Sequence, residues 1–252
     1  MIIHDTIHTS LLDLRSISYR IILPSNCRKT VLWLHGRTET SDRLIEHGIF
    51  KQMAEEYGIA ILFPDVPDNY YLNQTWNSVH CLTEDFLIQE FLPAVTAKYN
   101  LPSKHDRLFI AGISMGGFGS LLIGGHHPEL FGKIACISGA FIIDDILLSN
   151  LEVIGSAANA GYFASLFGDL PSLWDDAERN PWIAAQSVLL TGELPPIYLT
   201  CGTSDQLIDA NRKMFQRLQS AGTDVTWSDA PGVHKWEFFT PAVERVFAWL
   251  AS

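Results

Sequence analysis

The sequence predicts an α/β fold, in which helices flank a mostly parallel sheet. Short β-rich runs alternate with longer amphipathic runs, which is the pattern of parallel strands joined by crossover helices. Of the 252 residues, 47% are hydrophobic and 18% are charged, so the chain can bury a large core. The length suits one large domain, and we expect a single domain over residues 1–252.

The predicted elements follow in order along the chain. Residues 16–23 are strand-like and no helix precedes residue 30, so this segment should add antiparallel strands at the sheet edge. Parallel strands are expected where β-rich runs recur, at residues 30–34, 59–63, 107–111, 133–138, 197–201 and 225–228. Helical spacing of apolar residues predicts helices at residues 44–57, 84–99, 114–124, 210–220 and 241–250.

One segment, residues 141–194, is longer than an ordinary crossover between the fourth and fifth parallel strands. It is rich in bulky apolar side chains, so we predict a helical insertion. This insertion fills out the core, or forms a lid or pocket wall above the strand ends, where open α/β sheets bind ligands. Four of its aromatic residues are predicted to wall a substrate site: Phe163, Phe167, Trp174 and Trp182.

The net charge of the chain and the absence of certain sequence motifs disfavour several classes of binding partner. The 17 basic and 28 acidic residues give a formal net charge of −11, which disfavours nucleic acid and anionic membranes. The N-terminus lacks a basic and apolar leader and no apolar run has the length of a membrane span, so we expect a cytoplasmic protein. No CxxC pair or HExxH motif is present, and we expect no metal or cofactor. The expected partner is a small molecule, and a homo-oligomer stays open.

The sharpest functional signal is Gly112-Ile113-Ser114-Met115-Gly116, a G-x-S-x-G motif between a predicted strand and a predicted helix. In such a turn the serine backbone is strained and the hydroxyl is lifted clear of the sheet. Side chains at the two glycines would collide with each other or with the neighbouring strand. Ser114 is the predicted nucleophile. The helix N-terminus offers free N–H groups, and the Met115 N–H is a predicted oxyanion donor.

A serine hydroxyl needs a base, and in this kind of site the acid and then the histidine follow the serine along the chain. His126 and His127 end the helix of the nucleophile, too far along it to turn back to Ser114. His234 lies in a turn-rich loop between the last predicted strand and the last predicted helix. His234 is therefore the predicted base.

Asp205 is the predicted acid, because it directly follows a Gly-Thr-Ser turn after the strand at residues 197–201. Weaker alternatives are other aspartates near strand ends: Asp209, Asp144 and Asp145. The loop after the first parallel strand should supply the second oxyanion donor, which we assign to the Arg37 backbone N–H. His35 in the same loop is expected to be structural, with its ring hydrogen-bonded to loop backbone.

These motifs resemble the esterase D-like branch of the α/β-hydrolase superfamily, which includes S-formylglutathione hydrolases and tributyrin esterases. The resemblance runs over nearly the whole chain from Thr30 and is carried by VLWLHG (31–36), AGISMGGFG (111–119), TCGTSD (200–205) and PGVHKWE (231–237). It implies the α/β-hydrolase fold, a cofactor-free carboxylesterase for short acyl esters or thioesters, and the same roles for Ser114, Asp205 and His234. After Gly36, however, this chain has Arg37-Thr38-Glu39-Thr40 where many relatives have a small or apolar residue and further glycines.

The predicted reaction is hydrolysis of an ester through an acyl-enzyme on Ser114. Two enzymatic alternatives share this triad: a carbohydrate-ester (acetyl or feruloyl) esterase and an acyltransferase. A non-catalytic binding module is less favoured, because all three triad residues are present in the expected order.

Overall fold

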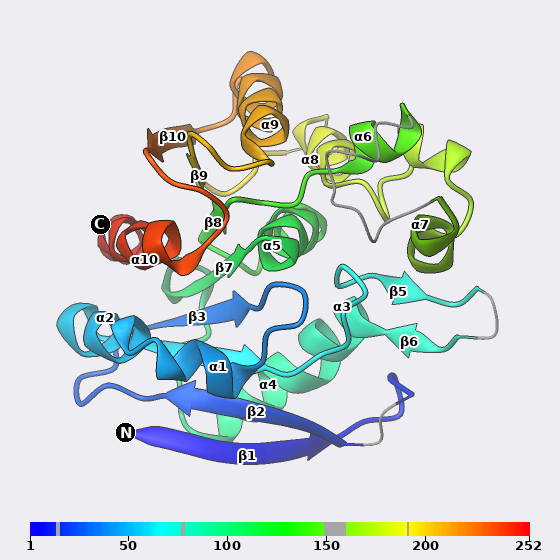
Figure 1. Cartoon of the computed structure of the whole chain (residues 1–252). Coiled ribbons are helices and arrows are strands. Elements are labelled where there is room, and N and C mark those ends of the chain that lie inside the picture. Colours follow the sequence, from blue (N-terminus) through cyan, green and yellow to red (C-terminus); the bar gives the residue numbers. More distant parts are fainter. Residues whose placement is uncertain (14–15, 77–78, 149–159, 191) are drawn as a thin grey trace.

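An eight-stranded sheet crosses the middle of the molecule in the computed structural model, which describes residues 1–13, 16–76, 79–148, 160–190 and 192–252 (Figure 1). In spatial order the strands are β1 (Ile2–His8), β2 (Ser16–Ile22), β4 (Ile59–Pro64), β3 (Lys29–Leu34), β7 (Leu108–Ile113), β8 (Lys133–Ile137), β9 (Ile197–Gly202) and β10 (Val225–Ala230). From β4 to β10 neighbouring strands pair in parallel, whereas β2 pairs antiparallel with both β1 and β4. The predicted parallel sheet with antiparallel strands at its N-terminal edge is confirmed.

Helices cover both faces of the sheet and bury two separate apolar cores (Figure 1). One face carries α1 (Ser41–Glu46), α2 (Ile49–Tyr57) and α10 (Trp236–Ala251). The other carries α3 (Thr83–Asp85), α4 (Leu92–Lys98), α5 (Met115–His126), α8 (Pro181–Leu189) and α9 (Ile208–Ser220). Central strands such as β4 and β7 are buried along their whole length, which explains their continuous apolar sequences. No helix within the described ranges is long and apolar enough to cross a membrane.

The connection between β8 and β9 is helical in its described part, as predicted for residues 141–194. It contains α6 (Ile143–Leu147), α7 (Ala160–Phe167), a 3₁₀ turn (Pro171–Trp174) and α8. Residues 149–159 and 191 of the predicted insertion lie outside the described residues. Its role as a lid stays a prediction.

Three predicted helices have different boundaries in the structure. The helix expected at residues 44–57 is divided into α1 and α2 at Gly48, whose φ of 73° ends the helical path. The helix expected at residues 84–99 contains a π-helical turn at Phe86–Phe91 between α3 and α4. The closing helix begins at Trp236, ahead of Pro241, because buried Phe238 and Phe239 hold its first turn against the core.

A short hairpin was not predicted. Its strands, β5 (Asn73–Gln74) and β6 (Cys81–Leu82), pair antiparallel and form a separate two-stranded sheet. Two-residue strands leave no alternation in the sequence that could identify them.

The ends of four parallel strands define the place of the predicted site. Strand β7 ends just before Ser114, β9 before the loop of Asp205, β10 before the loop of His234, and β3 before the loop of Arg37. Because parallel strands end at the same edge of a sheet, these four loops lie together, where α/β sheets bind ligands.

Candidate active site

Ser114 occupies a strained turn between β7 and α5, with φ 58° and ψ −116°. A positive φ is uncommon outside glycine and is found where the surrounding structure enforces it. Here the Ser114 N–H donates to the carbonyl of Ile137 (2.9 Å), and its carbonyl accepts from the N–H of Ala140 (2.9 Å). Strand β8 and the loop after it therefore hold the serine in its turn.

Both glycines of the motif are required by close backbone contacts. A Cβ on Gly112 would lie 2.5 Å from the carbonyl carbon of Gly116 and 2.7 Å from the carbonyl oxygen of Leu34. A Cβ on Gly116 would overlap the same Leu34 carbonyl. The predicted collision with each other and with the neighbouring strand is confirmed.

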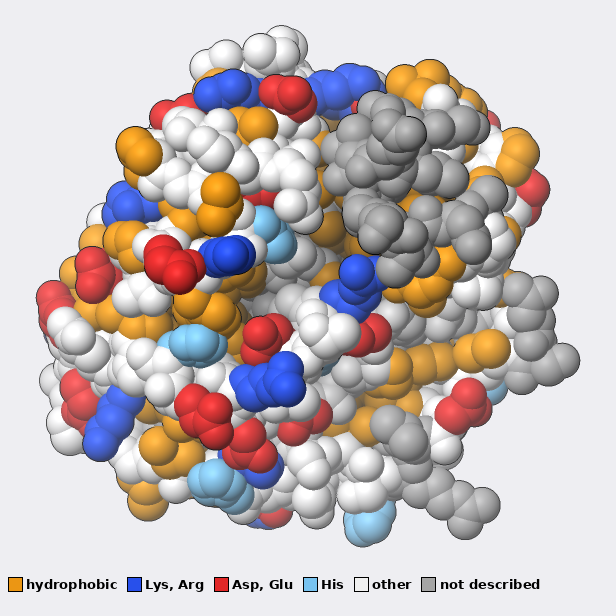
Figure 2. Space-filling view, viewed as in Figure 1, with side chains coloured by type: hydrophobic (Ala, Val, Ile, Leu, Met, Phe, Trp, Pro, Cys, Tyr) orange, Lys and Arg blue, Asp and Glu red, His pale blue; other side chains and the backbone are white. Residues whose placement is uncertain are grey.

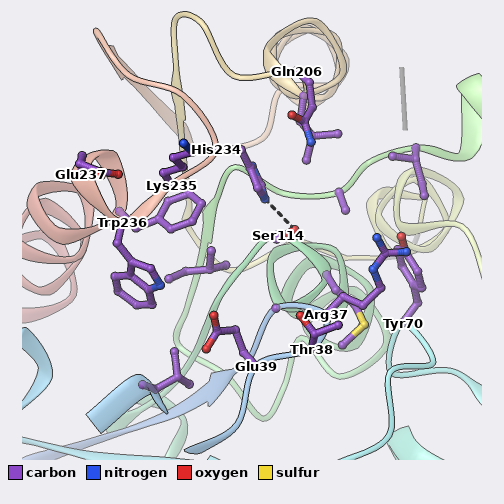
Figure 3. Close-up of a pocket in the computed structure, with 18 residues that line it drawn as sticks. Arg37, Thr38, Glu39, Tyr70, Ser114, Gln206, His234, Lys235, Trp236 and Glu237 are labelled. Atoms are coloured by element: carbon purple, nitrogen blue, oxygen red, sulfur yellow. Dashed lines mark hydrogen bonds between the residues drawn. The ribbon is translucent and has the colours of Figure 1, made fainter. Parts of the chain in front are cut away.

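The three residues of the predicted triad form one continuous relay. The His234 Nε2 lies 3.0 Å from the Ser114 Oγ (Figure 3). The His234 Nδ1 lies 2.8 Å from an Asp205 carboxylate oxygen. With its proton on Nδ1, the imidazole donates to Asp205 and offers Nε2 to the serine hydroxyl. In this arrangement the imidazole can take the hydroxyl proton.

The environment of Asp205 favours its carboxylate form. The side chain is buried, and its second oxygen accepts from the Leu207 N–H at 2.9 Å. Burial raises the pKa of the Asp205 carboxyl, but the hydrogen bond and charge of His234, together with the Leu207 amide, hold this pKa below its ordinary value. An ionised Asp205 can orient His234 and stabilise its imidazolium form.

Backbone bonds hold the loops of the acid and the base together. The Thr203 N–H donates to the Ala230 carbonyl and the Ser204 N–H donates to the Gly232 carbonyl, both at 2.9 Å. A Cβ on Gly202 would lie 2.5 Å from the Gly232 oxygen, so this close approach needs glycine. The distance between Asp205 and His234 is thus set by strands β9 and β10.

The competing base candidates and one competing acid candidate, Asp144, have other partners. His126 Nδ1 and His127 Nε2 lie 2.8 and 3.0 Å from the buried Glu84 carboxylate. The weaker acid candidates lie in first turns of helices, Asp144 and Asp145 in α6 and Asp209 in α9. Asp144 also pairs with Arg217 and Lys213.

The loop after β3 closes in a tight turn that presents the Arg37 amide. The Glu39 N–H donates to the Gly36 carbonyl (3.1 Å), and Thr38 inside the turn has φ 67°. The Thr38 N–H donates to the Asp68 carboxylate at 2.8 Å. In the described part of the chain, neither the Arg37 N–H nor the Met115 N–H has an acceptor. Both amides are therefore available for an oxyanion.

His35 is buried and structural, as predicted. Its ring nitrogens lie 2.8 Å from the Gly36 carbonyl and 3.1 Å from the Val66 carbonyl. The fully buried Tyr71 adds a hydrogen bond from its hydroxyl to the His35 carbonyl (2.7 Å). These bonds fasten the loop of Arg37 to the segment that follows β4.

A cavity of about 540 Å³ opens around Ser114. Figure 2 shows the hollow near the middle of the view, with acidic and basic side chains around it. Besides the residues already described, polar and apolar side chains line it: Glu39, Leu44, Tyr70, Ile113, Ala140, Ile142, Gln206, Lys235, Trp236, Glu237 and Phe239. Within the described residues, no group of three or more His, Cys, Asp or Glu side chains is arranged to hold a metal ion.

The family is decided by comparison with known proteins. The model of the Esterase family matches residues 15–250, which is nearly the whole chain. This chain belongs to the Esterase family. It is a serine esterase, a hydrolase of carboxylic esters, and it falls in the esterase D-like branch that the sequence motifs predicted.

Individual relatives and solved structures match the esterase over most of its length. An acetyl esterase of Caldicellulosiruptor saccharolyticus is 27% identical over 224 residues, or 89% of this chain and 84% of the relative. An S-formylglutathione hydrolase of Saccharomyces cerevisiae is 26% identical over 84% of this chain and 76% of its own. The solved structure of FphF, a fluorophosphonate-binding serine hydrolase of Staphylococcus aureus, matches with a TM-score of 0.87 at 21% identity, covering 100% of this chain and 98% of that one. The fold is the α/β-hydrolase fold.

The four aromatic residues predicted to wall the substrate site do not line the described cavity of the esterase. Phe163 and Phe167 are completely buried in the core, behind the cavity wall, where Phe167 contacts Tyr70 at 5.1 Å between ring centroids. Trp174 is 54% exposed, and Trp182 packs under Arg217 on another surface. The described cavity thus does not support a substrate-binding role for these four residues, and that role stays a prediction.

Sequence reasoning missed several residues that shape the site of the esterase. Asp68 and Tyr71 hold the oxyanion loop, and Glu39, Gln206 and Trp236 line the cavity. One signal was available for the first two, because they follow a predicted parallel strand and hence lie at the same sheet edge as Ser114.

Proposed function

We propose that this serine esterase cleaves short-chain acyl esters or thioesters through an acyl-enzyme on Ser114. The observation that carries the proposal is the relay from buried Asp205 through His234 to Ser114, with atom separations of 2.8 and 3.0 Å, at a cavity of about 540 Å³. Such a relay activates an otherwise weak hydroxyl nucleophile. Two free amides beside it add a place for the negative charge that develops in acyl transfer.

The reaction has two halves. The Ser114 Oγ attacks the acyl carbonyl while His234 Nε2 takes its proton, and the Met115 and Arg37 amides bind the oxyanion. His234 then gives that proton to the leaving alcohol or thiol. In the second half, water gives a proton to His234 Nε2 and attacks the acyl carbonyl. The bond to the Ser114 Oγ then breaks, His234 returns the proton to this oxygen, and the acid is released. Asp205 stays ionised throughout and holds the imidazole in its catalytic tautomer.

The acyl length is inferred from the relatives. One relative is an acetyl esterase and another is an S-formylglutathione hydrolase, and their names specify acyl groups of two carbons and one carbon. The cavity of about 540 Å³ must hold the acyl part together with the alcohol or thiol part. A location in the cytoplasm belongs to the same proposal.

Hydrolysis of p-nitrophenyl esters from acetate to decanoate tests the proposal. We expect the highest kcat/KM at acetate or propionate and a steep fall with chain length. Ser114→Ala should lower kcat by about 10³-fold or more, because it removes the nucleophile. Undiminished activity in Ser114→Ala would overturn the assignment of Ser114, and a flat profile to decanoate would overturn the short acyl site.

A further inference from the structure

Two glutamates that the proposed mechanism does not use line the cavity, and of these Glu39 is the one with an unsatisfied buried oxygen. Residues 36–39 form the turn that presents the Arg37 amide, which we call the oxyanion turn. Glu39 lies at the end of this turn, and its side chain lines the cavity beside Ser114 (Figure 3). One of its carboxylate oxygens is buried and has no hydrogen-bond donor among the described residues. An unsatisfied buried acceptor is costly, and such groups are found where a ligand supplies the missing donor.

Glu39 forms no ion pair with any described residue. Arg37 lies on the opposite side of Ser114 in Figure 3, and its guanidinium donates to the Tyr162 hydroxyl at 3.2 Å. Burial lowers the pKa of His47, and the charges of Glu39 and Glu46 oppose this shift. A substrate hydroxyl beside Glu39 therefore meets a carboxylate oxygen that has no other donor among the described residues.

Trp236 forms an apolar wall on the same side of Ser114 as Glu39 (Figure 3). Its ring stacks on His47 with centroids 3.4 Å apart and meets Phe239 edge-on at 5.7 Å, so its position is held from two directions. A rigid aromatic surface beside a charged acceptor suits a molecule with a carbon skeleton and hydroxyl groups.

We propose that Glu39 is a specificity-determining residue that accepts a hydrogen bond from a hydroxyl group on the alcohol part of the substrate, while the carbon skeleton of that alcohol packs against Trp236. The inference rests on the proposed acyl-enzyme function. We place the alcohol part beside Trp236 because His234 must protonate the leaving oxygen. Trp236 follows His234 by two residues and lines the same cavity. The same charge repels alcohols or thiols that carry a carboxylate.

Matched ester pairs test the role of Glu39. Glycerol 1-acetate and propyl acetate share an acyl group and a three-carbon alcohol, and they differ in two hydroxyl groups. We expect wild type to favour glycerol 1-acetate in kcat/KM and Glu39→Ala to lower this preference by about tenfold. Glu39→Gln should lower it less, because the amide oxygen still accepts. Either variant should raise kcat/KM for O-acetylglycolate, whose alcohol part is an anion.

Controls separate this idea from general damage and from the proposed function. Glu46→Gln removes the same charge from an exposed position on α1 and should leave every ratio unchanged. Activity of wild type on p-nitrophenyl acetate tests the esterase function itself, whereas the ratio between paired esters tests Glu39, since a distorted loop would slow both members equally.

An unchanged ratio in Glu39→Ala and Glu39→Gln would overturn the proposal. A second outcome would also overturn the proposal. If Glu39→Ala lost a preference for acetylcholine over the uncharged 3,3-dimethylbutyl acetate but kept the preference for glycerol 1-acetate, Glu39 would bind a cation and not a hydroxyl group.

Discussion

The nucleophile turn and the oxyanion turn each contain a residue whose backbone conformation side chains disfavour. Ser114 has φ 58° in the nucleophile turn, and Thr38 has φ 67° in the oxyanion turn. Such strain persists where neighbouring bonds enforce it. For Ser114 these are backbone bonds to residues around β8, whereas Thr38 depends on the side chain of Asp68. The oxyanion turn is therefore the more easily perturbed of the two.

Removal of the Asp68 carboxylate should slow catalysis without unfolding the protein. In Asp68→Ala the Thr38 N–H loses its acceptor, the strained turn loosens, and the Arg37 amide is less well placed for the oxyanion. We expect kcat on p-nitrophenyl acetate to fall about three- to tenfold with little change in KM. Asp68→Asn, which keeps an acceptor oxygen, should lie between Asp68→Ala and wild type. A rise in KM with unchanged kcat would contradict this role.

Single residues differ in how far the sequence reveals them. Ser114, His234 and Asp205 were predictable because each lies in a local motif directly after a strand, where turn chemistry and chain order limit the choice. Glu39 and Asp68 were not predictable. Asp68 matters through a hydrogen bond to Thr38, which is 30 residues away along the chain. Glu39 matters because one of its carboxylate oxygens has no donor among the described residues. Composition cannot tell a buried ring from a cavity wall, so the substrate-binding role of the aromatic residues in the insertion stays a prediction.

Helix α5 packs its glycine-rich N-terminus directly against the end of β3. Gly116 approaches the Leu34 carbonyl, whereas Gly125, near the other end of the helix, has room for a methyl group with nearest atoms at 3.4 Å. The two positions therefore differ sharply in what an added side chain would meet, although both are buried glycines of one helix.

Replacement of these glycines should give opposite results. We expect Gly116→Ala to lower the free energy of unfolding by about 3 kcal/mol or more, because the added Cβ overlaps backbone that cannot move without shifting β3. Gly125→Ala should stay within about 1 kcal/mol of wild type, since contact strain is offset by higher helix propensity. Urea denaturation followed by circular dichroism measures both. Equal stabilities for the two variants would show that α5 packs differently.

The C-terminal end of α5 contains a buried ion pair that gives a pH dependence. Burial lowers the pKa of His126, but its bonds to Glu84 and to the Ala177 carbonyl outweigh this and raise the pKa to about 9, from an ordinary value of 6.5. A raised folded-state pKa means that the stabilisation is fully present below pH 6.5 and is lost as pH rises through 9.

The free energy of unfolding should therefore fall between pH 6.5 and pH 9.5 by about 1–3 kcal/mol more in wild type than in His126→Gln. Glutamine keeps a hydrogen-bond donor for one partner but does not titrate. The difference between the two proteins therefore isolates the contribution of His126 protonation to the free energy of unfolding. Urea midpoints at four or five pH values across this range give the comparison. Parallel curves for the two proteins would rule out a charged His126 in the fold.

Secondary elements were predicted well in type and less well in their limits. Strands were found because buried parallel strands read as continuous apolar runs. Helix ends were misplaced at Gly48, where a glycine with positive φ breaks the helix. They were also misplaced at the π-helical turn and at Pro241, where tertiary packing overrides local preference. The hairpin of β5 and β6 is too short for any periodic signal.

The whole molecule assembles its site from loops that are distant in sequence. The nucleophile, acid, base and oxyanion loops follow β7, β9, β10 and β3, and the parallel sheet brings all four to one edge. The class of fold and this edge could be predicted, because strand order along the chain and the direction of parallel strands are sufficient. The shape and charge of the cavity could not, because they depend on how the connecting segments pack.

The most direct test of the account is the reaction of the intact protein with a fluorophosphonate, followed by intact mass and peptide mapping. A serine activated by the relay should form one adduct per chain, located on Ser114, and Ser114→Ala should form none. His234→Ala should react far more slowly, because the hydroxyl then lacks its base. A wild-type protein that stays unmodified, or an adduct on any other residue, would contradict the claim that Ser114 is the nucleophile.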